Sequence, residues 1–75
     1  MIIKLISTED NSEQILEVVS LNHQDGSNEI YILNAIGNSG TIIVKNIYDA
    51  DECMRNIYDK GKTQVKGVLV WGQRL

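Results

Sequence analysis

The stretch that decides the fold is YDADECMRNIYDKG, residues 48–61, which predicts one complete helix with a signal at each end. Asp49 is expected to cap the start, and Glu52 three residues later would complete a capping box. Gly61 supplies the left-handed residue that commonly ends a helix. The apolar side chains recur at the three- and four-residue spacing that lines one helix face; they are Ala50, Cys53, Met54, Ile57 and Tyr58. We therefore predict a helix over Asp49–Lys60.

On both sides of this helix the sequence has the composition of β-strands. Residues 29–36 alternate, which places Ile30, Ile32 and Ile36 on one face. Asp25-Gly26 precedes this segment and is a strong hairpin signal. A turn at residues 37–40 separates it from a β-branched segment, so the two segments are expected to form a hairpin. The strands predicted in this way cover residues 2–6, 29–36, 41–44 and 65–71.

Residues 15–21 are the one ambiguous segment. The run Val18-Val19-Ser20 favours extended structure, whereas a helix is the alternative because Ile15, Val18 and Val19 also share one helical side. A strand gives the order ββββαβ, an α+β fold with a mainly antiparallel sheet of four to five strands and one helix in the C-terminal half. A helix gives βαββαβ, the ferredoxin-like order.

Several strands are apolar on both faces, and together they present more apolar surface than one helix can cover. Leftover apolar surface or a free strand edge would favour a second copy or a partner, so the sequence leaves monomer and homodimer open. Trp71 is expected to close the core, and an interface anchor is the alternative. Gly67 predicts a bulge or a close approach of two backbones.

The length of 75 residues predicts a single domain, 1–75, near the size at which one core is just sufficient. The only cysteine, Cys53, excludes an internal disulfide and is expected to be a small buried side chain. The start, residues 1–6, lacks the pattern of a signal peptide. No apolar run approaches the ~18 residues that a membrane span needs. We expect a cytoplasmic protein that does not contact membrane.

Charge is distributed unevenly along the chain. Residues 1–44 contain one base, Lys4, and six acids, whereas residues 45–75 contain six bases and four acids. An acidic half disfavours contacts with nucleic-acid phosphates, which need Lys and Arg. It suits a basic protein surface instead.

No pattern in the chain predicts a catalytic centre, a metal site or a cofactor site. His23 is the only histidine and lies beside Asp25 in a polar turn, where we expect it to be exposed. One histidine and one cysteine cannot supply the usual zinc ligands. The acids Asp49, Asp51 and Glu52 lack the further ligands of a calcium loop and suit the start of a helix. We therefore expect no enzyme, no metal and no cofactor.

By exclusion, the sequence predicts a small acidic protein-interaction module, an inhibitor or adaptor that occupies a basic surface of a larger protein, such as a nucleic-acid-binding groove. Two polar turns are expected to carry the contact, through Glu9, Asp10, Glu13, Asp25 and Glu29. One alternative is an anion- or nucleic-acid-binding module that uses Lys60, Lys62, Lys66 and Arg74. Another is a small-ligand sensor, if the fold is ferredoxin-like.

Overall fold

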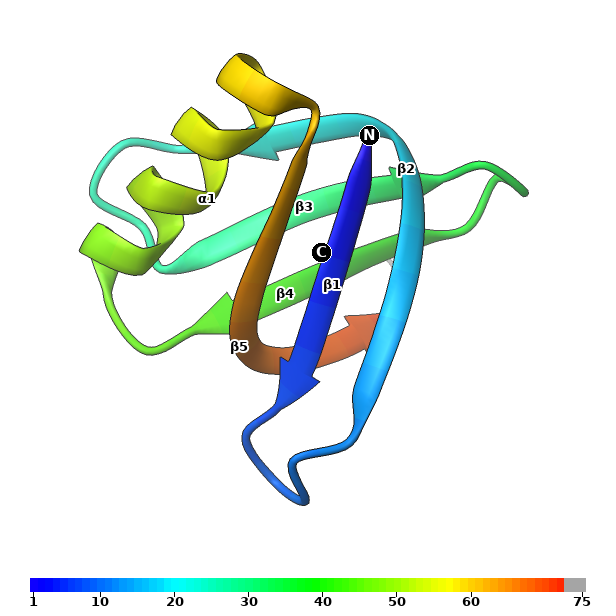
Figure 1. Ribbon diagram of the computed structural model, residues 1–75, viewed down its shortest axis with the longest axis horizontal. Coiled ribbons are helices and arrows are strands. Elements are labelled where there is room, and N and C mark those ends of the chain that lie inside the picture. Colours follow the sequence, from blue (N-terminus) through cyan, green and yellow to red (C-terminus); the bar gives the residue numbers. More distant parts are fainter. Residues whose placement is uncertain (73–75) are drawn as a thin grey trace.

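The computed structural model describes residues 1–72 and has five strands and one helix in the predicted order ββββαβ (Figure 1). The elements are β1 (Ile2–Ser7), β2 (Glu13–His23), β3 (Glu29–Asn34), β4 (Ser39–Val44), α1 (Ile47–Lys60) and β5 (Lys62–Trp71). The ambiguous segment lies within β2, so the prediction of a strand there is confirmed. The ferredoxin-like alternative is wrong.

The strands close into a barrel in the order β1-β2-β3-β4-β5. Neighbours in this order pair antiparallel, and β5 closes the barrel by pairing parallel with β1. Each strand therefore has a partner on both sides, which removes the free edges that the sequence led us to expect. Apolar side chains do remain on the outside, including Tyr31 and Val70. Self-association stays a prediction.

Two strongly bent strands make this closure possible. β2 pairs with β1 through its first half and with β3 through its second, with a bulge between Val18 and Ser20. β5 pairs with β1 as far as Gly67 and with β4 from Gly67 onward, so it turns a corner there (Figure 1). A Cβ on Gly67 would lie 2.5 Å from the carbonyl oxygen of Ile43. The predicted close backbone approach at Gly67 is confirmed.

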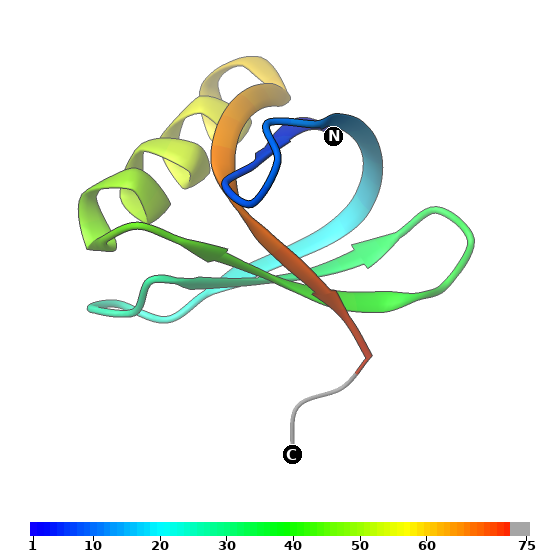
Figure 2. The same cartoon turned by 90° about the horizontal axis from the view of Figure 1, so that it is seen from below.

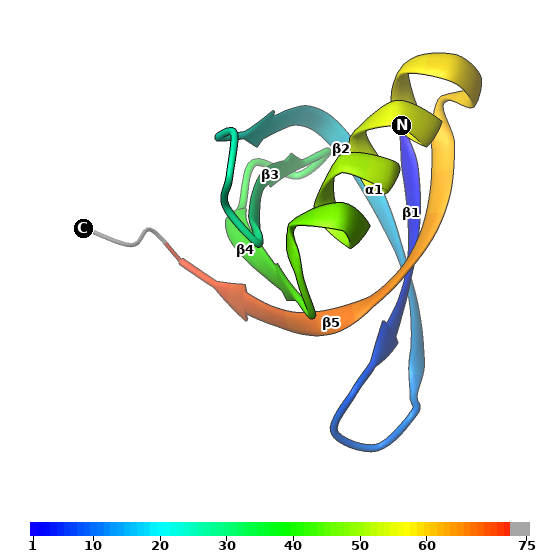
Figure 3. The same cartoon turned by 90° about the vertical axis from the view of Figure 1, so that its left-hand side faces the viewer.

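The core fills the barrel and the space under α1, which lies along β5 near one end of the barrel (Figure 3). Alternating residues of the strands point inward, and α1 adds a narrow stripe of three side chains. The buried apolar residues are Ile3, Leu5, Leu16, Val18, Ile30, Ile32, Ile42, Val44, Ala50, Cys53, Ile57 and Val65. Tyr58, predicted on the same helix face, is exposed because it lies on the flank of this stripe.

The helix begins earlier than predicted. Asn46 is the N-cap, and its side-chain oxygen accepts a hydrogen bond of 2.9 Å from the amide of Asp49. The prediction that Asp49 caps the helix is wrong, because Asp49 occupies the third helical position. Its carboxylate still lies in the first turn, where the helix dipole favours negative charge. Gly61 ends the helix as predicted, with a φ of 72° and its amide donating to the carbonyl of Ile57.

Burial makes Cys53 an unreactive thiol. Desolvation raises the pKa of Cys53 to about 11 from its ordinary value of 9.0, and the nucleophile is the thiolate. We expect alkylation by iodoacetamide at neutral pH to be at least roughly tenfold slower in the native protein than in urea. Because the folded-state pKa is the higher one, burial of the neutral thiol stabilises fully below pH 9.0 and is lost as the pH rises towards 11. Equal alkylation rates in the two states would contradict the burial of Cys53.

Candidate functional site

The turn between β1 and β2, residues 8–12, projects beyond the barrel (Figures 1 and 3). We call residues 8–13 the acidic turn. Its backbone is closed by two hydrogen bonds of 2.9 Å, from the amide of Ser7 to Ser12 and from the amide of Asn11 to Ser7. Asn11 has a φ of 61°, a left-handed conformation that asparagine tolerates. The acidic side chains are thus carried on a loop with a defined shape.

Within this turn the carboxylates have different partners. The amide of Ser12 donates to Asp10 at 3.0 Å, and this bond is the main reason that the pKa of Asp10 lies below its ordinary value. Glu13 forms an ion pair of 2.6 Å with Lys4 on β1. Glu9 is exposed. Glu9 and Asp10 therefore present their carboxylates to solvent, whereas the carboxylate of Glu13 is shared with Lys4.

Asp25 and Glu29, the other acids predicted to contact a partner, lie elsewhere. Asp25 lies in the turn between β2 and β3, and Glu29 is the first residue of β3. This turn is tied to the end of β4, because the side-chain amide of Asn28 donates to the carbonyl of Val44 at 3.0 Å. This turn and the acidic turn lie far apart in all three views (Figures 1, 2 and 3). The five acids predicted as one surface thus form two separate groups.

The lysines of the alternative site are also divided. Lys60 and Lys62 border a hollow of about 370 Å³, together with Lys4 of β1. Lys66 lies instead beside Asp49 and Glu52, and Arg74 lies outside the described residues. Sequence reasoning missed Lys4, since its approach to Lys62 depends on the parallel pairing of β1 with β5.

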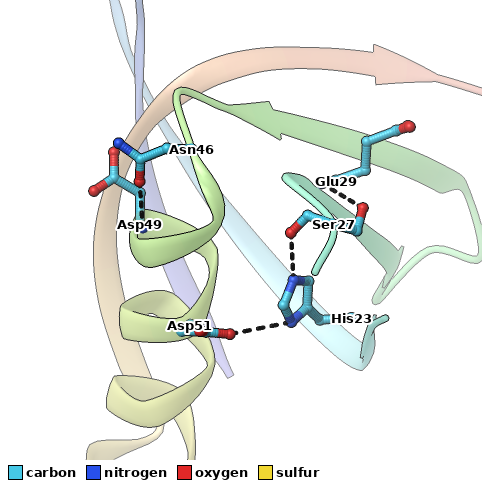
Figure 4. A network of polar contacts seen from close by, with 6 residues as sticks. All are labelled: His23, Ser27, Glu29, Asn46, Asp49 and Asp51. Atoms are coloured by element: carbon cyan, nitrogen blue, oxygen red, sulfur yellow. Dashed lines mark hydrogen bonds and ion pairs between the residues drawn. The ribbon is translucent and has the colours of Figure 1, made fainter. Parts of the chain in front are cut away.

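The side chain of His23 is buried, so the prediction of an exposed turn histidine is wrong. This side chain is 3% exposed, at the end of β2 under α1 (Figure 4). Nε2 lies 2.7 Å from the carbonyl oxygen of Ser27, and Nδ1 lies 3.8 Å from a carboxylate oxygen of Asp51. A carbonyl oxygen accepts only, so Nε2 carries the hydrogen. The ring thereby contacts the β2–β3 turn through Nε2, while Nδ1 faces the helix at a distance too long for a hydrogen bond.

This arrangement does not resemble a Ser-His-Asp triad. The histidine contacts the backbone carbonyl of Ser27, and the hydroxyl oxygen of Ser27 accepts from the amide of Glu29 at 3.0 Å (Figure 4). The acid that faces the ring is Asp51 of α1 and not Asp25, the neighbour of His23 in the sequence. Within residues 1–72 no group of three or more His, Cys, Asp or Glu side chains could hold a metal ion.

Trp71 is half exposed rather than buried in the core as predicted. It pairs with Gly40, and a Cβ on Gly40 would lie 2.9 Å from the indole ring, so the ring covers this glycine. Trp71 borders an open groove of about 440 Å³, which we call the mouth. Residues 14–17 of β2, Asn34 at the end of β3 and residues 35–36 of the following turn form the rest of the mouth. Ile15 and Ile36 expose 61% and 82% of their area beside it.

The sequence placed Ile36 on the same strand face as Ile30 and Ile32. This prediction is wrong because β3 ends at Asn34, and Ile36 lies in the following turn. The alternation of side chains over Glu29–Ile36 continues in the sequence past the end of the strand. In the structure the amide of Gly37 donates to the carbonyl of Asn34 and forms a turn there. The mouth was therefore not visible in the sequence.

Comparisons with protein-family models, with curated proteins and with solved structures find no match to this chain. Within residues 1–72, no helix has the length and apolar character needed to cross a membrane. Proposals about function rest on the geometry of the acidic turn, the lysine hollow and the mouth.

Proposed function

We propose that this protein is a small acidic interaction module, an inhibitor or adaptor that occupies a basic surface of a larger protein. The observation that carries the proposal is the acidic turn. Its carboxylates project from the barrel on a loop closed by its own hydrogen bonds. A contact surface that is already ordered loses less conformational entropy on binding. Complementary charge speeds the encounter with a basic partner and disfavours acidic ones.

The proposal gives Glu9 and Asp10 the main contact, and Glu13 adds to it by exchanging its ion pair with Lys4 for one with the partner. Asp25 and Glu29, which lie far from this turn, would contact the same partner only if it wrapped around the barrel. His23 has no catalytic role in this account, since its two nitrogens face the Ser27 carbonyl and Asp51. The small-ligand sensor depended on a ferredoxin-like order, which the chain does not have.

A second candidate function is anion or nucleic-acid binding at the lysine hollow. It is favoured by the convergence of Lys4 with Lys60 and Lys62 around one depression. Against it, Lys4 is already paired with Glu13, and acids outnumber bases in the whole chain. Phosphate contacts become weaker as the surrounding surface becomes more negative.

A pull-down from the native cell tests the proposal when it compares two variants of equal charge. One variant is Glu9→Gln, Asp10→Asn and Glu13→Gln, in which the new side-chain amide at position 10 can still accept from the backbone of Ser12. The matched control is Asp51→Asn, Glu52→Gln and Asp59→Asn, which removes three exposed charges of α1 that the proposal does not use. We expect the first variant to lose its main protein partner and the control to keep it.

The opposite pattern would contradict the proposal. If the partner is kept by the first variant and lost when Lys4, Lys60 and Lys62 are reversed to Glu, the contact lies at the lysine hollow. Salt dependence alone does not distinguish the two sites, because salt screens exposed charges of either sign.

A further inference from the structure

The mouth is a groove with an apolar floor and an aromatic wall. Register places Leu16 opposite Ile3, and Gly40 opposite Ile32 and Trp71, so Leu16 and Trp71 both lie on the inner face of the barrel. Leu16 is buried at the floor, whereas Trp71 is exposed over 44% of its area. Helix α1 packs chiefly on β5 and leaves this groove uncovered. Mouths of β-barrels are common binding sites.

The rim of the mouth exposes side chains that a solvated surface rarely gathers. Ile36 of the β3–β4 turn borders the groove with Trp71, whereas Ile15 lies on the outer face of β2, opposite Lys4. Single exposed apolar residues are ordinary, but contiguous ones mark interaction sites. Tryptophan is among the residue types most enriched in binding hot spots, which lie near the centre of such patches.

The charged residues at the mouth indicate what kind of segment would bind there. Glu17 is the only charged residue among those described at the mouth, and none of them is basic. Glu13 and Glu17 both lie on the outer face of β2, paired with Ile6 and Ile2, and Lys4 lies between them opposite Ile15, in its ion pair with Glu13. Four residues of strand separate them by roughly 13 Å. β2 therefore leads from the acidic turn to the mouth, and a short extended peptide can reach both.

From this geometry we infer that the mouth binds a large apolar side chain of an extended basic segment in the partner. The apolar side chain would pack on Trp71, Leu16 and Ile36, while flanking Arg or Lys residues lie beside Glu17 and reach Glu9 and Asp10, the acids of the acidic turn that Lys4 does not pair. The inference rests on the proposed function and assigns it a second contact, one that depends on shape and burial rather than on charge.

Two synthetic peptides of equal charge test this inference. One is Arg-Arg-Gly-Leu-Gly-Arg-Arg, and the other has Ser in place of Leu. Trp71 is the only tryptophan, so its fluorescence reports directly on the mouth. We expect the Leu peptide to shift the emission to shorter wavelength and to bind about tenfold more tightly than the Ser peptide, because burial of leucine is worth at least that factor.

Two matched variants locate the effect. In Ile36→Ser the ratio of the affinities for the Leu peptide and the Ser peptide is expected to fall close to one. Folding is expected to be unchanged, because Ile36 is 82% exposed. Tyr58→Ser removes an equally exposed apolar residue on α1 and is expected to keep the preference. A preference that survives Ile36→Ser, or one that is lost equally in Tyr58→Ser, would overturn the assignment to the mouth.

The outcomes also separate this inference from the proposed function. If both peptides bind equally but neutralising Glu9, Asp10 and Glu13 weakens both, the mouth assignment fails and the acidic contact stands. If the Leu preference is present and neutralisation changes nothing, the mouth is supported and the acidic contact fails. An emission shift that depends on protein concentration without peptide would assign the mouth to a second copy and overturn the inference.

Discussion

Ile57→Asp is expected to lower the free energy of unfolding by roughly 4 kcal/mol, enough to unfold much of a protein of this size. Ile57 is 6% exposed and packs in the core cluster under α1. The substitution would remove a buried apolar side chain and place a carboxylate among apolar neighbours. Urea denaturation followed by circular dichroism measures the change.

The matched control is the neighbouring residue. Tyr58→Asp introduces the same carboxylate one position along the helix, where the side chain is 81% exposed, and is expected to change the stability by about 0.5 kcal/mol or less. A free energy of unfolding that is unchanged in Ile57→Asp would show that the assignment of the buried helix face is wrong.

Gly67→Ala is expected to cost about 3 kcal/mol, an unusually large effect for one added methyl group. The new Cβ would meet the carbonyl oxygen of Ile43 at 2.5 Å. The obstacle is backbone rather than a flexible side chain, so β4 and β5 must separate at the corner where β5 changes partners. Thermal unfolding gives the size of the effect.

Gly26→Ala separates this close approach from the usual cost of replacing glycine. Gly26 has a φ of 81° and nothing within 4 Å of an added Cβ, so only left-handed backbone strain is expected, about 1 kcal/mol. A cost for Gly67→Ala no larger than that of Gly26→Ala would mean that the barrel corner is looser than described.

Local patterns account for the parts of the fold that the sequence predicted. The apolar spacing of Ala50, Cys53 and Ile57 and the glycine at position 61 identify α1 without reference to the rest of the chain. The β-branched run at Val18-Val19 identifies β2 as extended. Such signals act over a few residues, so they survive in any tertiary context that buries the same face.

Barrel closure could not be predicted in the same way. The pairing of Ile2 with Lys62 joins residues at opposite ends of the chain, and nothing local to either strand specifies it. Barrel closure also depends on the bends at Gly67 and at the β2 bulge, and only the bend at Gly67 was indicated by the sequence. Asn46 was overlooked as the N-cap because Asp49 offered an equally acceptable side chain three residues later.

The candidate site was predicted only in part. Glu9, Asp10 and Glu13 follow from composition, since an exposed acidic turn needs no tertiary information. Their separation from Asp25, and the approach of Lys4 to Lys60, depend on how the strands are arranged in space. The mouth depends on where β3 ends, and the apolar residue Ile36 alternated as if the strand continued.

The most direct test of one continuous partner surface is NMR mapping of the labelled protein during titration with the Leu peptide. The account predicts simultaneous, saturable shifts in the amides of residues 9–17 and 36 and in the indole N–H of Trp71. Shifts confined to the lysine hollow around Lys4, Lys60 and Lys62, or to the turn that carries Asp25, would contradict it.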